Sequence, residues 1–181
     1  MMKKTFMAIV TMALSAYLAP QAGAQSLSLG PQAGYQKAKD ADDGKLMGGL
    51  ALRLKLSQSL GVEGSINYRQ EKFNDALTVR SWPIMVTGLF YPLPVAYGAI
   101  GAGWYNSKFD FEAPGNAASI EERKQEFGWH FGCGVELPLG AHTKLAGDVR
   151  YVFLNYDFDK VPGVQIDRDF YVITAGILFG L

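Results

Sequence analysis

Eight charged side chains recur at alternate positions of short segments that otherwise carry glycine or other small residues. They are Arg53, Lys55, Glu63, Arg69, Glu126, Glu136, Asp148 and Arg150. Both signs are present, and an enclosed charge must pair with an opposite charge or be hydrated, because isolated burial costs too much free energy. We expect these residues to form a network of ion pairs that fixes the structure. The alternative is an ionic path, which requires a pair that can exchange partners.

Other kinds of chemistry lack the residues or the spacing that they need. His130 and His142 are too few for a convincing metal site, and no cofactor is expected. Gly98, Gly101 and Gly103 lack the G-x-G-x-x-G order of a phosphate-binding loop, and no helix follows them. No G-x-S-x-G nucleophile elbow occurs. We therefore expect a protein that is not an enzyme.

The stretch Glu126–Leu139 shows how such charges are positioned. One parity of this stretch is apolar: Phe127, Trp129, Phe131, Cys133, Val135, Leu137 and Leu139. The other parity holds glycines, His130, Pro138 and two glutamates. A period of two predicts a β-strand, here with one apolar face and one small-or-charged face. This combination is typical of a strand between lipid and a tight polar lumen.

Seven further segments alternate in the same way. They are Leu27–Lys37, Lys45–Leu56, Leu60–Gln70, Leu77–Tyr91, Ala96–Asn106, Lys144–Tyr156 and Phe170–Leu181. The connectors alternate between longer loops (Ala38–Gly44, Glu71–Ala76, Ser107–Arg123 and Asp157–Asp169) and short turns (Ser57–Ser59, Pro92–Val95 and Gly140–Thr143). Membrane barrels have short periplasmic turns and longer outer loops, and closure removes their edges. The sequence predicts an all-β fold, an eight-stranded antiparallel up-and-down transmembrane β-barrel.

The apolar face should point outward because an eight-stranded barrel is only just wide enough for side chains inside. The many apolar residues would overfill it, whereas the glycine-rich face fits. The outward aromatic residues also gather near the strand ends. Those near the longer loops are Tyr35, Tyr68, Trp82, Trp104, Trp129, Phe153 and Tyr171, and those near the short turns are Phe90 and Phe179. Amphipathic rings prefer the membrane interfaces, so we expect two aromatic girdles.

The first 24 residues read as a signal peptide. Lys3 and Lys4 precede the apolar stretch Thr5–Leu18, and Ala22-Gly23-Ala24 is a small-x-small cleavage site. Cleavage leaves residues 25–181, which are 181 − 24 = 157 residues and suit one domain. Loss of two lysines leaves 15 basic and 17 acidic residues, a balance that argues against nucleic acid as a partner. No later apolar run is long enough for a membrane-spanning helix.

The chain resembles the small outer-membrane β-barrel family of the outer-membrane protein A and X type. The resemblance lies in the alternation of Leu60–Arg69 and Glu126–Leu139, in the glycine strand Ala99–Gly103 and in the C-terminal run. In that family the last residue is usually aromatic and helps the assembly machinery to recognise the chain. Here the corresponding insertion signal consists of Tyr171, Phe179 and Leu181, and the final residue departs from the pattern.

The resemblance implies a protein of the bacterial cell outer membrane. We expect a structural, membrane-integrity or surface-interaction role, and a narrow porin-like channel for small solutes is the alternative. A lipid-modifying enzyme is less favoured, because the His-x-Ser of the lipid A deacylases is replaced by His130-x-Gly132 on the lumen parity. The expected partners are outer-membrane lipids and lipopolysaccharide, the assembly machinery, periplasmic chaperones and a surface ligand at Ser107–Arg123.

Overall fold

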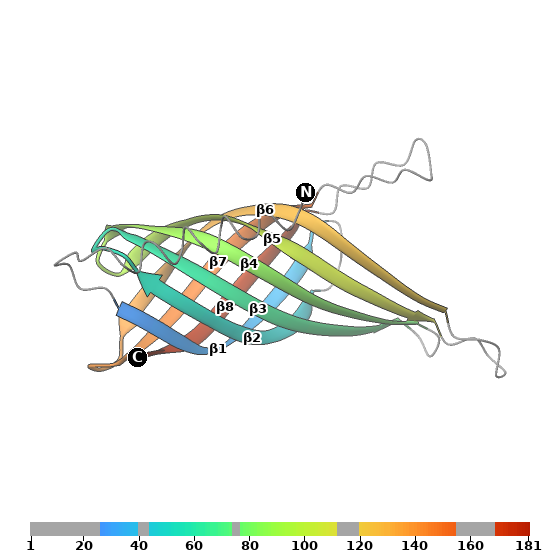
Figure 1. Ribbon diagram of the computed structural model, residues 1–181, viewed down its shortest axis with the longest axis horizontal. Helices are drawn as coiled ribbons and strands as arrows, with labels where there is room; N and C mark the ends of the chain where they lie inside the picture. The colour runs from blue at the N-terminus through green and yellow to red at the C-terminus, as the bar shows by residue number, and fades with distance from the viewer. Residues whose placement is uncertain (1–25, 40–43, 74–76, 112–119, 155–168) are drawn as a thin grey trace, which may run out of the picture.

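The computed structural model describes residues 26–39, 44–73, 77–111, 120–154 and 169–181. These residues form eight strands: β1 (Ser26–Ala38), β2 (Lys45–Lys55), β3 (Leu60–Phe73), β4 (Leu77–Leu93), β5 (Ala96–Phe111), β6 (Ile120–Pro138), β7 (Thr143–Leu154) and β8 (Phe170–Gly180). Each strand pairs antiparallel with the next, and β8 pairs with β1, so the sheet closes into a barrel (Figure 1). The predicted eight-stranded antiparallel barrel is confirmed. The predicted signal peptide lies outside the described residues.

The register of the sheet carries a stagger. Directly opposed partners lead around the barrel from Ser28 through Arg53, Glu63, Thr87, Gly101, His130, Val152 and Phe170 to Ala38. One circuit therefore returns to β1 ten residues (38 − 28) beyond its start. A stagger of this kind tilts the strands against the barrel axis, as Figure 1 shows.

The predicted outward parity is the exposed one on the strands whose burial is described. On β6 the exposed set runs from Phe127 to Leu137 at every second residue, and most residues between them are buried or half-buried. The same alternation holds on β7 and β8. Within the described residues, no helix is long and apolar enough to span a membrane.

Several strands are longer than the sequence predicts. β3 runs to Phe73 rather than Gln70, β5 runs to Phe111 rather than Asn106, and β6 begins at Ile120 rather than Glu126. The predicted loop Ser107–Arg123 is therefore partly strand, and its boundaries were wrong. Pairing continues because an antiparallel ladder satisfies backbone groups whether or not the side chains alternate in polarity. In Figure 1, β3 to β6 extend beyond the rim formed by the other strands.

The inside of the barrel is less polar than the sequence predicts. A cluster of buried apolar side chains lies in the lumen, and we call it the apolar layer: Met47, Met85, Tyr105, Val152, Leu154, Phe170 and Val172. Smaller clusters join Leu89, Tyr91, Tyr97 and Ala99, and join Ala51, Ala146 and Leu178. The expected polar, glycine-rich lumen face is therefore only part of the interior. Side chains of one barrel interior must fill its volume, and glycine and charged residues by themselves do not fill it.

Candidate functional site

Neighbouring strands place the first charges of the lumen side by side. Arg53 on β2 lies directly opposite Glu63 on β3, and Glu63 lies directly opposite Thr87 on β4. All three side chains point inward, because they belong to the buried parity of their strands. The register alone therefore brings a base, an acid and a hydroxyl together on one wall of the barrel.

Five buried charges then meet across the lumen, and we call them the ion cluster: Arg53, Glu63, Glu136, Asp148 and Arg150. Each is between 1 % and 6 % exposed. Arg53 Nε donates to Glu63 Oε2 at 3.0 Å, and its Nη1 donates to Glu136 Oε2 at 2.8 Å. Arg150 Nη2 donates to Glu63 Oε1 at 2.6 Å and to Asp148 Oδ2 at 2.8 Å. The two guanidinium groups thus link β2, β3, β6 and β7.

Hydroxyl groups satisfy further atoms of the ion cluster. Tyr97 donates to Asp148 Oδ2 at 2.9 Å and accepts from Arg53 Nη2 at 3.1 Å. Tyr91 donates to Glu136 Oε2 at 2.9 Å. On the β7–β8 side, Thr174 donates to Asp148 Oδ1 at 2.9 Å. Buried charges are tolerated only when their remaining hydrogen-bonding capacity is used, so these hydroxyls are part of the network.

A glycine between two strands makes one of these contacts possible. Gly134 on β6 lies opposite both Tyr97 on β5 and Asp148 on β7. A Cβ at Gly134 would lie 2.5 Å from the Tyr97 ring and 2.6 Å from Asp148 Cβ. The missing side chain therefore leaves the space in which the Tyr97 hydroxyl reaches the carboxylate. This packing explains why a glycine stands at this position of the lumen parity.

Two lysines complete the site at the short-turn end of the barrel. Lys144 Nζ lies 3.0 Å and Lys55 Nζ lies 3.8 Å from Glu136 Oε1. Their side chains are 28 % and 20 % exposed, in contrast to the buried ion cluster. Lys55 also lies over the Tyr91 ring, 4.1 Å from its centroid. The charged network thus reaches solvent at this end.

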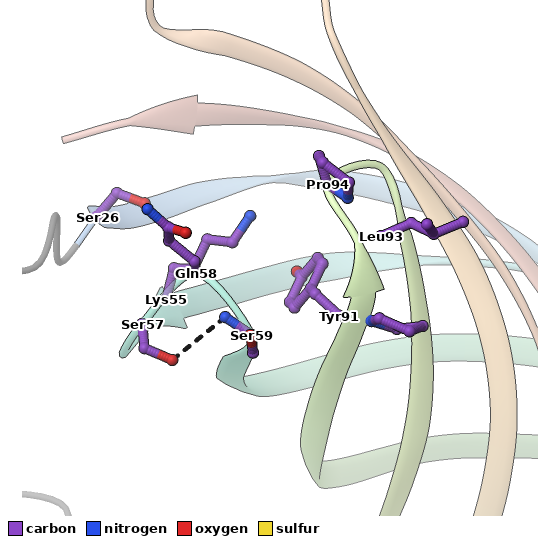
Figure 2. A pocket seen from close by; sticks show the side chains of 9 residues that line it. Ser26, Lys55, Ser57, Gln58, Ser59, Tyr91, Leu93 and Pro94 are labelled. Atoms are coloured by element: carbon purple, nitrogen blue, oxygen red, sulfur yellow. Dashed lines mark hydrogen bonds between the residues drawn. The ribbon is translucent and has the colours of Figure 1, made fainter.

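A pocket of about 490 Å³ opens at the same end. It is lined by the turn after β2, by the turn between β4 and β5, and by Lys55 and Tyr91 (Figure 2). The Ser57 hydroxyl accepts hydrogen bonds from the backbone N–H of Ser59 and of Leu60 at 3.2 and 3.1 Å, which holds the first turn. Because Lys55 and Tyr91 both contact Glu136, the pocket leads from the turns to the edge of the ion cluster.

The structure places the predicted charges in three groups. Arg53, Glu63, Glu136, Asp148 and Arg150 come together in the ion cluster, and Lys55 lies at its turn-side edge. Arg69 and Glu126 are half-buried and lie farther toward the long-loop end, outside this cluster. The predicted network lacks Lys144, Tyr91, Tyr97 and Thr87. Their positions on the inward parity of their strands could have identified them.

His130 lies on the lumen parity, as the sequence indicates, and it is buried. Its Nε2 lies 2.9 Å from Thr87 Oγ1, and Arg150 Nη1 donates to the same hydroxyl at 3.1 Å. Among the described residues, no group of three or more His, Cys, Asp or Glu side chains is arranged to hold a metal ion. What the geometry provides is electrostatic cross-linking of the barrel walls.

The seven aromatic residues predicted for the loop-side girdle divide between exposed and less exposed positions. Five of them are exposed, and the other two, Trp82 and Trp104, are half-buried. Relative to the row from Ser28 to Phe170, Tyr35 lies seven residues toward the loop end, Trp104 three and Trp129 one. The offset decreases from β1 to β6 in step with the stagger of the tilted barrel. The three rings therefore lie at a similar height along the barrel axis. Their role at a membrane interface stays a prediction.

The predicted insertion signal lies on and beyond β8. Tyr171 and Phe179 point outward and are exposed. Leu181 follows the strand, and its backbone N–H donates to the carbonyl oxygen of Leu27 at 2.9 Å. Recognition of these residues by an assembly machinery stays a prediction.

The sequence profile of the outer membrane protein beta-barrel domain matches residues 6–179. The match covers nearly the whole chain, and the protein belongs to this family of outer-membrane β-barrels. A comparison with curated protein sequences finds no relative.

Solved structures share the fold. A major outer membrane protein of Thermus thermophilus has a TM-score of 0.65 and 12 % identity, with 86 % of this chain and 99 % of that chain covered. Neisserial surface protein A has a TM-score of 0.60 and 12 % identity, with 84 % and 96 % covered. Ail, the attachment invasion locus protein of Yersinia pestis, was solved with the heparin analogue sucrose octasulfate. It has a TM-score of 0.55 and 17 % identity, with 87 % and 97 % covered. At these identities the likeness concerns the fold alone.

Proposed function

We propose that this protein is a non-enzymatic integral barrel of the bacterial outer membrane with a closed lumen and a structural, membrane-integrity or surface-interaction role. The observation that carries the proposal is the ion cluster. Arg53 and Arg150 cross-link the walls of the lumen through ion pairs of 2.6 to 2.8 Å to Glu63, Glu136 and Asp148. An eight-stranded barrel leaves little room beside such side chains, so they narrow the lumen and make the barrel rigid.

The surface-interaction part of the proposal rests on the long strands. β4, β5 and β6 have 17, 16 and 19 residues, whereas β2, β7 and β8 have 11 or 12. The extra length lies at the long-loop end, where β3 to β6 rise beyond the other strands (Figure 1). A surface ligand would meet this extension, including the paired segments Ser107–Phe111 and Ile120–Arg123.

The outward apolar face would contact outer-membrane lipids and lipopolysaccharide. Periplasmic chaperones and the assembly machinery would act on the chain before its insertion into the membrane.

Two measurements test this proposal, one on the purified wild-type barrel and one on a deletion strain. Purified barrel in a planar bilayer should show no steady ionic current, and a deletion strain should become more sensitive to detergents and bile or lose binding to host cells. Complementation with the wild-type gene should restore the phenotype. Steady conduction by the wild type would overturn the closed-lumen proposal. A deletion strain with intact barrier and surface binding would overturn the assigned role.

A narrow channel for small solutes is the second candidate. The observation in its favour is that bases and acids share partners: Glu136 contacts Arg53, Lys144 and Lys55, and Glu63 contacts both arginines. A base can leave one carboxylate in such a network without losing every partner. The bilayer measurement separates this candidate from a closed barrel. For a lipid-modifying enzyme, mass analysis of lipid A from the deletion strain is the corresponding test.

A further inference from the structure

We infer that the apolar layer, and not the ion cluster, seals the lumen toward the long-loop side. The ion cluster then forms a separate polar compartment that exchanges with solvent only through the short-turn end. This inference rests on the proposed closed barrel and says where its barrier lies.

The order of residues along the strands separates the two regions. On β7 the inward residues from the turn end are Lys144, Ala146, Asp148 and Arg150, followed by Val152 and Leu154. On β8 Thr174 lies on the turn side of Val172 and Phe170, on β2 Arg53 lies on the turn side of Met47, and on β4 Thr87 lies on the turn side of Met85. On each of these four strands a polar residue thus lies on the turn side of the apolar layer, although the buried Leu89 on β4 and Leu178 on β8 lie nearer still to the turn end. The fifth contributor is Tyr105 on β5, four residues farther toward the loop end than Gly101, which lies opposite Thr87.

The apolar layer is packed from opposite walls. The rings of Tyr105 on β5 and Phe170 on β8 meet edge to face, with centroids 5.7 Å apart. The Tyr105 hydroxyl donates to the Met85 sulfur at 3.5 Å. On β6 the residue at this level is Gly128, where a Cβ would lie 2.5 Å from Leu154 Cδ2 and 3.0 Å from the Tyr105 ring. The glycine lets both large side chains fill the lumen.

One sector of this level is polar but filled. On β3 the inward residue is Asn67, which is buried, and its Oδ1 accepts a hydrogen bond of 2.7 Å from Gln32 Nε2 on β1. Across β2, a Cβ at Gly49 would come into close contact with the same amide. The Gln32–Asn67 pair therefore closes the β1–β3 side next to the apolar layer.

The turn side of the ion cluster has a different character. Lys55 and Lys144 are partly exposed there, and the 490 Å³ pocket reaches Lys55 and Tyr91. Among the described residues, Ser65 Oγ, His130 Nδ1 and Arg150 Nε are buried without a protein hydrogen-bond partner, and so is Asn67 Nδ2 beside the apolar layer. Buried polar groups are normally bonded to protein or to ordered water. Water reaches such atoms more readily past lysines than past the apolar layer.

The two regions respond differently to a mutation. A narrow apolar constriction excludes water and ions by dewetting, whereas a charged constriction is hydrated as soon as a charge loses its partner. Loss of one ion pair therefore leaves the barrier in place. Ions should cross only when the apolar layer is opened as well.

The experiment compares three refolded variants with the wild type in planar bilayers. The first is Glu136→Ala. The second adds Tyr105→Ala and Phe170→Ala in the apolar layer. The third, a matched control, adds Phe131→Ala and Phe153→Ala to Glu136→Ala; these two stacked rings are exposed on the outward face, with centroids 5.6 Å apart. Heat-modifiable mobility on gels selects folded barrels of each variant before current is recorded.

We expect only the second variant to conduct ions. Its recordings should show steps of current, whereas the wild type, Glu136→Ala and the control should show none. Current in Glu136→Ala alone would overturn the inference and make the ion cluster the seal. A folded second variant that stays closed would overturn it too. A conducting wild type would overturn the proposed closed barrel instead, so the two failures are distinguishable.

Discussion

Arg53 and Glu136 are 83 residues apart in the chain, yet Arg53 Nη1 donates to Glu136 Oε2 at 2.8 Å across the lumen. The contact joins β2 to β6, two strands that do not pair with each other in the sheet. It ties opposite walls of the barrel where the backbone ladder supplies no bond. Its loss should therefore be felt as a loss of barrel stability.

Glu136→Ala should destabilise the barrel. Arg53 loses one carboxylate, and Lys144 and Lys55 lose theirs. Removing one partner of a buried pair costs about 3–5 kcal/mol, less where water replaces the partner. Urea unfolding in detergent micelles measures the free energy of unfolding. A double-mutant cycle with Arg53→Ala should show strong coupling, and one with Arg69→Ala should be additive within about 0.5 kcal/mol. Equal coupling to both arginines would contradict the cluster.

A charge on the outward face of β3 should be poorly tolerated. Ile66 is exposed on that face between Leu50 of β2 and Ile84 of β4. Ile66→Arg should cost about 2–4 kcal/mol if this face lies in the hydrocarbon region. The neighbouring Ser65→Ala serves as control and should be neutral, because the buried Ser65 hydroxyl has no protein hydrogen-bond partner. The comparison is made by refolding into lipid vesicles, and equal yields for both variants would show that the facing is wrong.

Gly134→Ala should disturb the contact between Tyr97 and Asp148. The new Cβ would lie 2.5 Å from the Tyr97 ring and 2.6 Å from Asp148 Cβ, so one of them must move. Overpacking of this kind typically costs about 1–3 kcal/mol. Gly98→Ala is the matched control, because a Cβ at Gly98 meets no atom within 4 Å. Unfolding midpoints of the two variants give the comparison, and an equally stable Gly134→Ala would contradict the close packing.

Topology can be tested with cysteines in a Cys133→Ser background. Lys39 lies exposed at the loop end of β1, and Ser59 lies exposed in the turn before β3. A membrane-impermeant thiol reagent should label Lys39→Cys in intact cells and Ser59→Cys only after permeabilisation. The opposite pattern would reverse the orientation. Asn116 and Gly163, in the predicted outer loops, are outside the described residues but should label as Lys39→Cys does.

The alternation of residue types was sufficient to predict the strands and their two faces. A period of two is a local property, since consecutive side chains of a strand point to opposite sides. In Glu126–Leu139 the apolar face is visible at every second residue. The narrow interior of eight strands then decides which face points out. The strand ends at Phe111 and Ile120 were missed, because pairing there continues through charged residues.

Only the tertiary structure decided which inward residues meet. The register of the closed sheet, which has a stagger of ten residues, sets Arg53 beside Glu63. The lumen is narrow enough for the same guanidinium to reach Glu136 on the opposite wall. Arg69 has the same parity and charge as Arg53 but lies too far along its strand to join the ion cluster. The apolar layer was hidden for a related reason. Each of its strands contributes one or two residues, such as Met47 or Phe170, and they become a layer only when closure brings five strands around one axis.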